Sequence, residues 1–335
     1  MLVKNIRWRI GTVLVSAALA LGASGWYFRH SIEGQWLRLA LPEVAPPPRG
    51  TARFAVIGDY GSGNHHERDV AQMIESWKPD FIATVGDNNY PMGEAETIDR
   101  NIGRFFHTYI SPYRGSYGTG ATANRFFPII GHRDWDSPSG LQPYLDYFTL
   151  PGNERYYDFV WGSVHFFMLD TDDREPDGAT VASIQARWLE RKLRESRAPW
   201  KLVLAHHAPY TSHAVPDTER MRWPFKAWGA DAVLSGFYHV YERLLVDGVP
   251  YFVNGAGGLW VSDFGEIDSH SLVRYREDFG AMLIDASGTR IVFRFVNRSG
   301  RVIDECALVK PPVREVLPRS CQTREAVAPD IRVSQ

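Results

Sequence analysis

The sequence predicts an α/β fold in which two packed β-sheets are flanked by helices. Short apolar runs of strand length alternate with stretches of helical periodicity from about residue 54 to residue 240. Two later apolar runs, 281–284 and 291–296, are expected to complete a second sheet. The chain has 335 residues, 44% of them hydrophobic, which is enough for one large domain with a sizeable core or for two small ones.

Five of the apolar runs lead into a side chain that can bind a metal ion. In chain order these side chains are Asp59, Asp87, His132, His206 and His239. Ligands collect at the carboxyl ends of strands in α/β sheets, so we expect these groups to converge. Oxygen and imidazole donors from separate strands suit a pair of borderline or hard metal ions. The near-absence of cysteine argues against structural zinc.

Helical periodicity separates the strands. Expected helices cover residues 65–77, 94–110, 141–148 and 184–196. Asn64 is a suitable N-cap for the first of them. A pair of strands, 156–160 and 164–169, is expected around a Trp-Gly turn, and the strand at 251–254 ends in a glycine-rich turn.

The N-terminal segment has the pattern of a membrane anchor. Residues 1–9 carry basic side chains, and residues 10–28 form an uncharged, mostly apolar run close to the roughly 20 residues that span a bilayer. The positive charge predicts that residues 1–9 stay in the cytoplasm and that the rest is exported, to the periplasm or the outer face of the membrane. A cleaved signal peptide, with residues 18–20 as the cleavage site, remains an alternative.

Three further segments follow. Residues 29–50 are proline-rich and are expected to form an extended linker, residues 51–300 the folded domain, and residues 301–335 a tail. The tail holds the only two cysteines, Cys306 and Cys321, which in an exported protein favour a disulfide. The formal net charge of −2 gives no indication of a nucleic-acid partner.

Five short motifs resemble those of a known family. They are Gly58-Asp59-Tyr60-Gly61, Gly86-Asp87-Asn88-Asn89-Tyr90, Gly131-His132-Arg133-Asp134, Val203-Leu204-Ala205-His206 and Gly236-Phe237-Tyr238-His239. This ordered set resembles the calcineurin-like metallophosphoesterases, and among them the purple acid phosphatases of the small, tartrate-resistant type. Tyr90, three positions after Asp87, is the distinguishing residue. The resemblance covers about residues 51–300 and implies a four-layer αββα fold.

The resemblance also implies a centre of two metal ions. It assigns the first ion to Asp59, Asp87, Tyr90 and His239, with Asp87 bridging both ions. A tyrosinate is a hard, strongly donating ligand, so this ion is expected to be Fe(III). The second ion is expected to be divalent Fe, Zn or Mn. Such a pair can activate a water molecule for attack on a small phosphorylated substrate, and the expected reaction is hydrolysis of phosphomonoesters.

The chain departs from the family at the second ion. The third motif of the family reads Gly-Asn-His-Asp or Gly-Asn-His-Glu, but here His132 replaces the asparagine ligand and Arg133 the catalytic histidine. In the fifth motif Phe237 replaces a histidine ligand. Asp87, His132 and His206 still offer three donors, and three ligands plus water make an open catalytic site. A mono-metal or inactive variant is the alternative.

Two residues are candidates for contact with the substrate. Arg133 does not lose its proton near neutral pH, so it cannot be a general acid, but it can hold a phosphoryl group. His213 is the candidate proton donor, with an ordinary loop residue as the alternative. Two other functions stay open: a phosphodiesterase or nucleotide phosphatase, and a non-catalytic, membrane-tethered phosphate-binding protein.

Overall fold

The computed structural model describes residues 45–214, 219–310 and 320–321. The chain divides into two units, residues 1–42 and residues 43–335, and the fold described below belongs to the second. The expected anchor at 10–28, the basic segment before it, most of the linker and most of the tail lie outside the described residues. Within the described ranges, no helix combines the length and apolar character needed to cross a bilayer.

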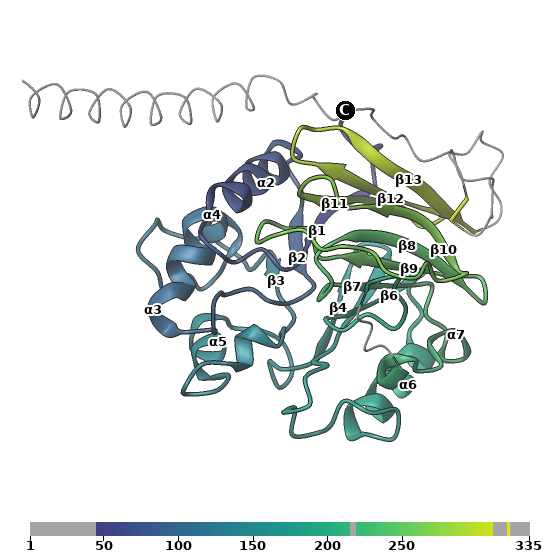
Figure 1. Ribbon diagram of the computed structural model, residues 1–335, viewed down its shortest axis with the longest axis horizontal. Coiled ribbons are helices and arrows are strands. Elements are labelled where there is room, and N and C mark those ends of the chain that lie inside the picture. Colours follow the sequence, from purple (N-terminus) through teal and green to yellow (C-terminus); the bar gives the residue numbers. More distant parts are fainter. Residues whose placement is uncertain (1–44, 215–218, 311–319, 322–335) are drawn as a thin grey trace, which may run out of the picture. The chain divides into compact units, whose positions relative to one another are not determined.

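The first sheet has six strands in the order β13-β12-β11-β1-β2-β3 (Figure 1). Their bounds are β1 Ala52–Ile57, β2 Phe81–Thr84, β3 Phe126–Phe127, β11 Gly280–Ala286, β12 Arg290–Asn297 and β13 Val302–Val309. Strands β1, β2 and β3 are parallel, and the other neighbours are antiparallel.

Two expectations about the late strands were wrong. Strands β11 and β12 do not complete a second sheet, because β11 pairs antiparallel with β1, with Phe54 opposite Ile284. The sheet also continues past residue 300, where we expected the domain to end, since β13 pairs with β12.

The second sheet has seven strands in the order β10-β8-β9-β7-β6-β5-β4. Their bounds are β4 Tyr157–Trp161, β5 Val164–Met168, β6 Trp200–Ala205, β7 Ala232–Ser235, β8 Tyr241–Val246, β9 Val249–Asn254 and β10 Ser271–Tyr275. Strands β5, β6, β7 and β9 run parallel in the middle of this sheet. Such strands are buried on both faces, which explains their continuous apolar sequences.

The two sheets pack face to face through aromatic side chains. The rings of Phe54 in β1 and Phe166 in β5 meet edge to face, with centroids 5.0 Å apart. Tyr241 in β8 stacks on Phe295 in β12 with centroids 4.2 Å apart. Such pairs contribute about 0.5–1.5 kcal/mol each beyond the area they bury. The core therefore lies between the sheets, and their relative position is fixed by specific ring contacts.

Helices cover the outer faces, so the predicted class of two packed sheets flanked by helices is confirmed (Figure 1). Helix α2, His65–Ser76, lies by the first sheet and is capped by Asn64, whose Oδ1 accepts from the Glu67 N–H at 3.0 Å. Helices α6, Ile184–Glu195, and α7, Phe225–Trp228, share one apolar cluster with the second sheet.

The remaining helical segments are short. The expected single helix at 94–110 is divided into α3 Ala95–Ile98, a π-helical turn η1 Asp99–Gly103, α4 Arg104–Phe106 and a 3₁₀ turn η2 His107–Tyr109. The others are η3 Arg133–Trp135, α5 Gln142–Tyr147 and η4 Glu219–Met221.

The two cysteines form a disulfide, as predicted. Cys306 lies in β13 and is bonded to Cys321, with Cα atoms 4.9 Å apart. The bond closes a segment of 15 residues along the chain.

We predict that Cys321→Ala lowers the free energy of unfolding by about 3 kcal/mol, because the open chain gains the entropy that a loop of this length otherwise removes. Denaturant unfolding of the oxidised protein measures the change. Wild-type protein in reductant should unfold at the same denaturant concentration as Cys321→Ala. An unfolding midpoint that reductant does not move would contradict the prediction.

Candidate metal centre

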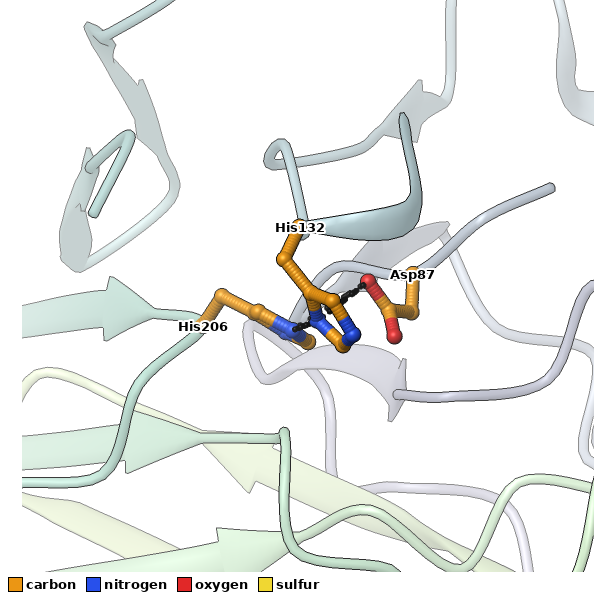
Figure 2. Close-up of side chains that lie close together, drawn as sticks. All are labelled: Asp87, His132 and His206. Atoms are coloured by element: carbon orange, nitrogen blue, oxygen red, sulfur yellow. Dashed lines mark hydrogen bonds and ion pairs between the residues drawn. The ribbon is translucent and has the colours of Figure 1, made fainter. Parts of the chain in front are cut away.

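Three side chains meet in an arrangement that could hold a metal ion: Asp87, His132 and His206 (Figure 2). His132 Nδ1 and His206 Nε2 each lie 3.2 Å from Asp87 Oδ1, and the two nitrogens are 3.1 Å apart. Ligands that bind one ion at about 2.0–2.2 Å lie about 3 Å from one another. The spacing of the three donor atoms therefore fits a single ion.

Asp87 is held at the centre of this group by its backbone. It follows β2 after Gly86 and has a φ of 51°, in the left-handed region that few non-glycine residues adopt. The Arg133 N–H donates to Asp87 Oδ1 at 2.9 Å. A Cβ at Gly131 would lie 2.0 Å from the Asp87 nitrogen, so glycine is required there for the two loops to approach.

His206 follows β6 and is fully buried. Its Nδ1–H donates to the carbonyl of Val85 at 2.8 Å, which leaves Nε2 free to face Asp87. Burial lowers the pKa of His206, but Asp87 outweighs this effect and raises it to about 9. Burial likewise raises the pKa of Asp87, but His206 and His132 together lower it well below its ordinary value. The carboxylate is therefore held in its charged form.

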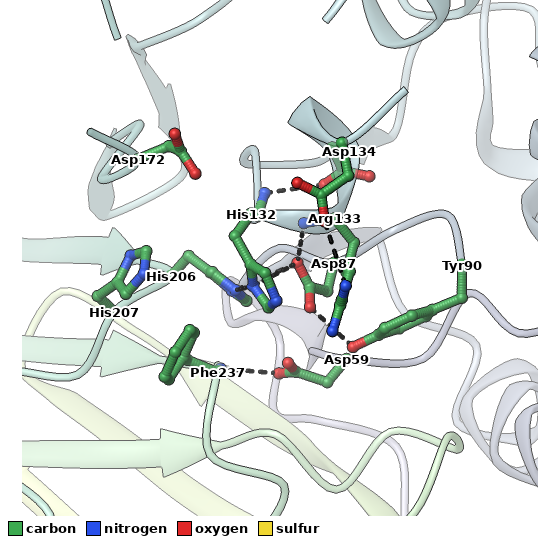
Figure 3. A network of polar contacts seen from close by, with 12 residues as sticks. Asp59, Asp87, Tyr90, His132, Arg133, Asp134, Asp172, His206, His207 and Phe237 are labelled. Atoms are coloured by element: carbon green, nitrogen blue, oxygen red, sulfur yellow. Dashed lines mark hydrogen bonds and ion pairs between the residues drawn. The ribbon is translucent and has the colours of Figure 1, made fainter. Parts of the chain in front are cut away.

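A second set of donors lies on the other side of Asp87 (Figure 3). The Tyr90 hydroxyl donates to Asp87 Oδ2 at 2.8 Å, and His239 Nε2 lies 3.7 Å from Asp59 Oδ1. Asp59 Oδ1 is buried and has no hydrogen-bond partner among the described residues, whereas Oδ2 accepts from the Phe237 N–H at 3.0 Å.

This second set also fits a cation. Burial raises the pKa of Asp59 and of Tyr90, and the Asp87 charge raises both further. A buried carboxylate oxygen without a donor is costly unless a cation is bound to it. Three oxygen donors and one imidazole around this position suit a hard ion.

Phe237 lies where the resemblance expects a histidine ligand. Its φ is 69°, so Asp59, Asp87 and Phe237 all have left-handed backbones, the kind of local strain that clusters at functional sites. The Phe237 ring lies 4.5 Å from the ring of His207 and 5.1 Å from that of His132, centroid to centroid. An apolar wall therefore closes one side of the Asp87–His132–His206 group.

The two proposed substrate residues lie in different surroundings. The backbone of Arg133 contacts Asp87, and its side chain, which is 37% exposed, pairs with Asp136 at 3.2 Å. His213 packs its ring 4.7 Å from that of Tyr238, and its backbone pairs with Phe264. His213 is not part of the group of three around Asp87.

The sequence analysis did not identify the segment 170–174, which follows β5 and contacts the site. Asp170 accepts a hydrogen bond from Trp135 Nε1 at 3.0 Å, and Arg174 donates to the His132 carbonyl at 2.9 Å. A signal for it existed, because the apolar run of β5 leads directly into Asp170, as the other strands lead into their ligand-type residues.

Trp260 also escaped the sequence analysis. Its ring stacks on that of His239 with centroids 4.4 Å apart and planes 3° from parallel, while 49% of the residue stays exposed. It forms an aromatic rim beside the donors around Asp59.

Comparisons with known proteins indicate the family to which the chain belongs. Residues 37–241 match the family model described as calcineurin-like phosphoesterase. Purple acid phosphatase 7 of Arabidopsis thaliana is 24% identical over 295 residues, which cover 78% of this chain and 87% of that protein. Tartrate-resistant acid phosphatase type 5 of Mus musculus is 26% identical over 274 residues, covering 69% of this chain and 80% of the mouse protein.

Solved structures show the same fold. Purple acid phosphatase PPD1 from yellow lupin superposes with a TM-score of 0.62 at 19% identity, covering 80% of this chain, which spans only 55% of the lupin protein. GAP50, described as the anchor in the inner membrane complex of Plasmodium, gives a TM-score of 0.60 at 19% identity. The superposition covers 79% of this chain and 90% of the GAP50 chain. The match to the family model extends over more than half of the chain, and the chain therefore belongs to the calcineurin-like phosphoesterase family.

Proposed function

We propose that this protein is a metal-dependent phosphoesterase that hydrolyses phosphomonoesters with water at a centre of two metal ions sharing Asp87. The observation that carries the proposal is the position of the two Asp87 oxygens. Oδ1 lies 3.2 Å from a nitrogen of His132 and of His206, whereas Oδ2 accepts from Tyr90 at 2.8 Å. One carboxylate thus faces two separate sets of donors, as a bridging ligand must.

The two sets suit different ions. Asp59, Asp87, Tyr90 and His239 would hold the first, and a phenolate among oxygen ligands favours Fe(III). Asp87, His132 and His206 would hold the second, and two imidazoles with one carboxylate suit divalent Fe, Zn or Mn. When bound, such a pair lowers the pKa of water and neutralises the charge of the phosphoryl group.

The chain's own groups would complete the site. Arg133 would bind the phosphoryl oxygens and stabilise the charge that develops there, because a guanidinium presents several N–H donors in a planar fork. Its half-exposed side chain is accessible to a substrate. His213 remains our candidate for the proton donor to the leaving group. It lies beside Tyr238, which is adjacent in the chain to Phe237 of the apolar wall.

A second candidate function follows from Phe237. A phenylalanine cannot bind a metal ion, so its presence favours a phosphate-binding relative that holds one ion and does not turn over substrate. The metal content of the purified protein separates the two functions, since two ions per chain are needed for the proposed hydrolysis. Parallel assays with a phosphomonoester and a phosphodiester then test the choice of substrate class.

We further propose that the domain works outside the cytoplasm, tethered by residues 10–28. The N-terminal charge pattern supports this location, and so does the disulfide between Cys306 and Cys321, because such bonds persist in oxidising compartments. Protease added to intact spheroplasts should digest or release the domain. Complete protection of the domain would contradict the proposal.

We predict that Asp87→Asn abolishes phosphatase activity and reduces the content of both metal ions, because the amide removes the charge that both ions share. Metal analysis and turnover of a phosphomonoester measure these effects. Asp146→Asn, which changes an exposed carboxylate in α5, should leave both unchanged. An Asp87→Asn protein with full metal content and turnover would refute the bridging role.

A visible charge-transfer band from iron and Tyr90 should disappear in Tyr90→Phe.

We predict that His132→Ala lowers occupancy of the second ion and turnover together, while iron stays bound. Substitution of a residue that only contacts a metal ligand typically lowers metal affinity about 10–100-fold. Because His132 would itself be a ligand, the loss of affinity for the second ion should be at least as large. His132→Asn combined with Phe237→His restores the family pattern and should retain two ions. Histidine tolerates the left-handed backbone at residue 237 comparatively well.

Each single change should lower second-metal occupancy more than the pair does, because residues that share one site do not act additively. Unchanged metal content and turnover in His132→Ala would exclude His132 as a ligand.

A further inference from the structure

We propose that Arg174 is a positioning residue that fixes two parts of the site at once: the backbone of His132 and, through Asp136, the side chain of Arg133. The inference rests on the proposed function, because it concerns a proposed metal ligand and a proposed phosphate-binding group. Arg174 is not in any of the five family motifs, and it is one of the residues that the sequence did not reveal.

The guanidinium of Arg174 makes contacts in three directions. Nη2 donates to the His132 carbonyl at 2.9 Å, and Nη1 donates to Asp136 Oδ1 at 2.9 Å. Nε and Nη2 also donate to Oδ1 and Oδ2 of Asp172, at 2.7 and 2.9 Å. A planar guanidinium with five donors can satisfy all these acceptors in one fixed orientation, which the single ammonium of lysine cannot do.

Asp136 transmits this orientation to Arg133. One of its carboxylate oxygens accepts from Arg174, and the other accepts from Arg133 Nη1 at 3.2 Å. Charges therefore alternate along Arg133, Asp136, Arg174 and Asp172. Asp172 is the anchor of this row, because its side chain is only 8% exposed, whereas that of Arg174 is 44% exposed.

The segment that carries Arg174 is itself fixed to both neighbouring motifs. The Asp172 N–H donates to Asp170 Oδ1 at 3.0 Å, and Trp135 Nε1 donates to Asp170 Oδ2 at 3.0 Å. On the other side, the His207 N–H donates to Thr171 Oγ1 at 3.1 Å. Residues 170–174 thus connect the turn that holds His132 with the strand end that holds His206.

His132 needs such external support. Strand β3 before it has two residues, and the 3₁₀ turn η3 after it has three. His132 is the N-cap of this turn, and no side chain caps it. Within the turn the His132 carbonyl accepts only from the Trp135 N–H, at 3.2 Å, and the Arg174 guanidinium donates to the same carbonyl from outside the turn at 2.9 Å. The bond from Arg174 therefore adds an orientation to that set by the short local structure.

The exposure of Arg174 makes a purely stabilising role weak. Ion pairs of half-exposed side chains contribute little to folding, because water screens them and ordering the side chains costs entropy. The same contacts can still orient a metal ligand. Substitution of a residue that hydrogen-bonds to a metal ligand typically changes metal affinity or activity about 10–100-fold. The inference therefore predicts variants that fold normally but bind the second ion less tightly.

Zinc titration of the metal-free full chain against a competing chelator tests the first arm. Arg174→Ala should weaken zinc binding at the second site about 10–100-fold, with no change in the unfolding midpoint of the metal-free protein. Arg174→Lys should fall between Arg174→Ala and wild type, because one ammonium cannot reach all three acceptors. Arg194→Ala, which removes an exposed pair with Glu190, is the matched control and should bind zinc as wild type does.

Asp136→Asn tests the second arm separately. It removes the charge that attracts Arg133 but leaves the contact from Arg174 to His132 in place. KM for a phosphomonoester and the inhibition constant of inorganic phosphate should both rise about tenfold or more, with zinc affinity as in wild type. In Arg174→Ala, the loss of zinc affinity and the rise in KM should occur together.

Three results would overturn the inference. The first is Arg174→Ala with unchanged zinc affinity and KM, and the second is a zinc affinity that falls only in step with the unfolding midpoint. The third is Asp136→Asn with unchanged KM and phosphate inhibition. Wild-type protein that binds fewer than two ions and shows no turnover would instead refute the proposed function. Failure of the proposed function is thus distinguishable from failure of the role of Arg174.

Discussion

The site depends on one buried carboxylate that binds no candidate ion, that of Asp134. It accepts hydrogen bonds from the Asn88 N–H, from Asn88 Nδ2 at 2.8 Å and from the Gly131 N–H at 2.8 Å. The bonds from Asn88 join the loop after β2 to the loop after β3 and so set Asp87 against His132, whereas the bond from Gly131 orders the loop after β3 itself. Burial and the nearby Asp87 charge raise the pKa of Asp134 to about 7, although the N–H donors oppose them. Without this acceptor, the N–H groups of Asn88 and Gly131 would be left unpaired, each at a cost of about 1–3 kcal/mol, and Asn88 Nδ2 would keep only its bond to the Ile129 carbonyl.

The packing of the two sheets adds the second constraint. The first sheet supplies Asp59 and Asp87, and the second supplies His206. Two hydrogen bonds cross between them beside these side chains, one from His206 Nδ1 to the Val85 carbonyl at 2.8 Å and one from the Phe237 N–H to Asp59 Oδ2 at 3.0 Å. Each bond orients a candidate metal-binding side chain that follows a strand of one sheet, and its partner is a backbone group that follows a strand of the other sheet. The aromatic core between the sheets therefore matters for the site, because a small shift of one sheet would move His206 and His239 away from the donors that follow the strands of the other sheet.

The strand-end pattern predicted which side chains would lie together, because the loops that follow parallel neighbouring strands meet at the same edge of a sheet. Asp87, His132 and His206 are brought within 3.2 Å of one another. Sheet membership was not predictable in the same way. The pairing of β11 with β1 joins residues 54 and 284, and local periodicity carries no information about partners so far apart. Arg174 escaped prediction for a related reason, since its acceptor on His132 is 42 positions away and is a backbone atom.

Phe237 shows that the backbone and the side chain at one position can have separate roles. Its N–H holds Asp59 Oδ2 in a left-handed turn, and this contact needs no particular side chain. Its ring contributes only an apolar surface against His132 and His207. A phenylalanine at this position therefore leaves the donors around Asp59 intact. In the proposed centre of two ions, the absent imidazole would affect only the ion held by Asp87, His132 and His206. The His132 imidazole lies 3.2 Å from the same Asp87 oxygen as His206 does, so it is placed to supply the missing donor to that ion.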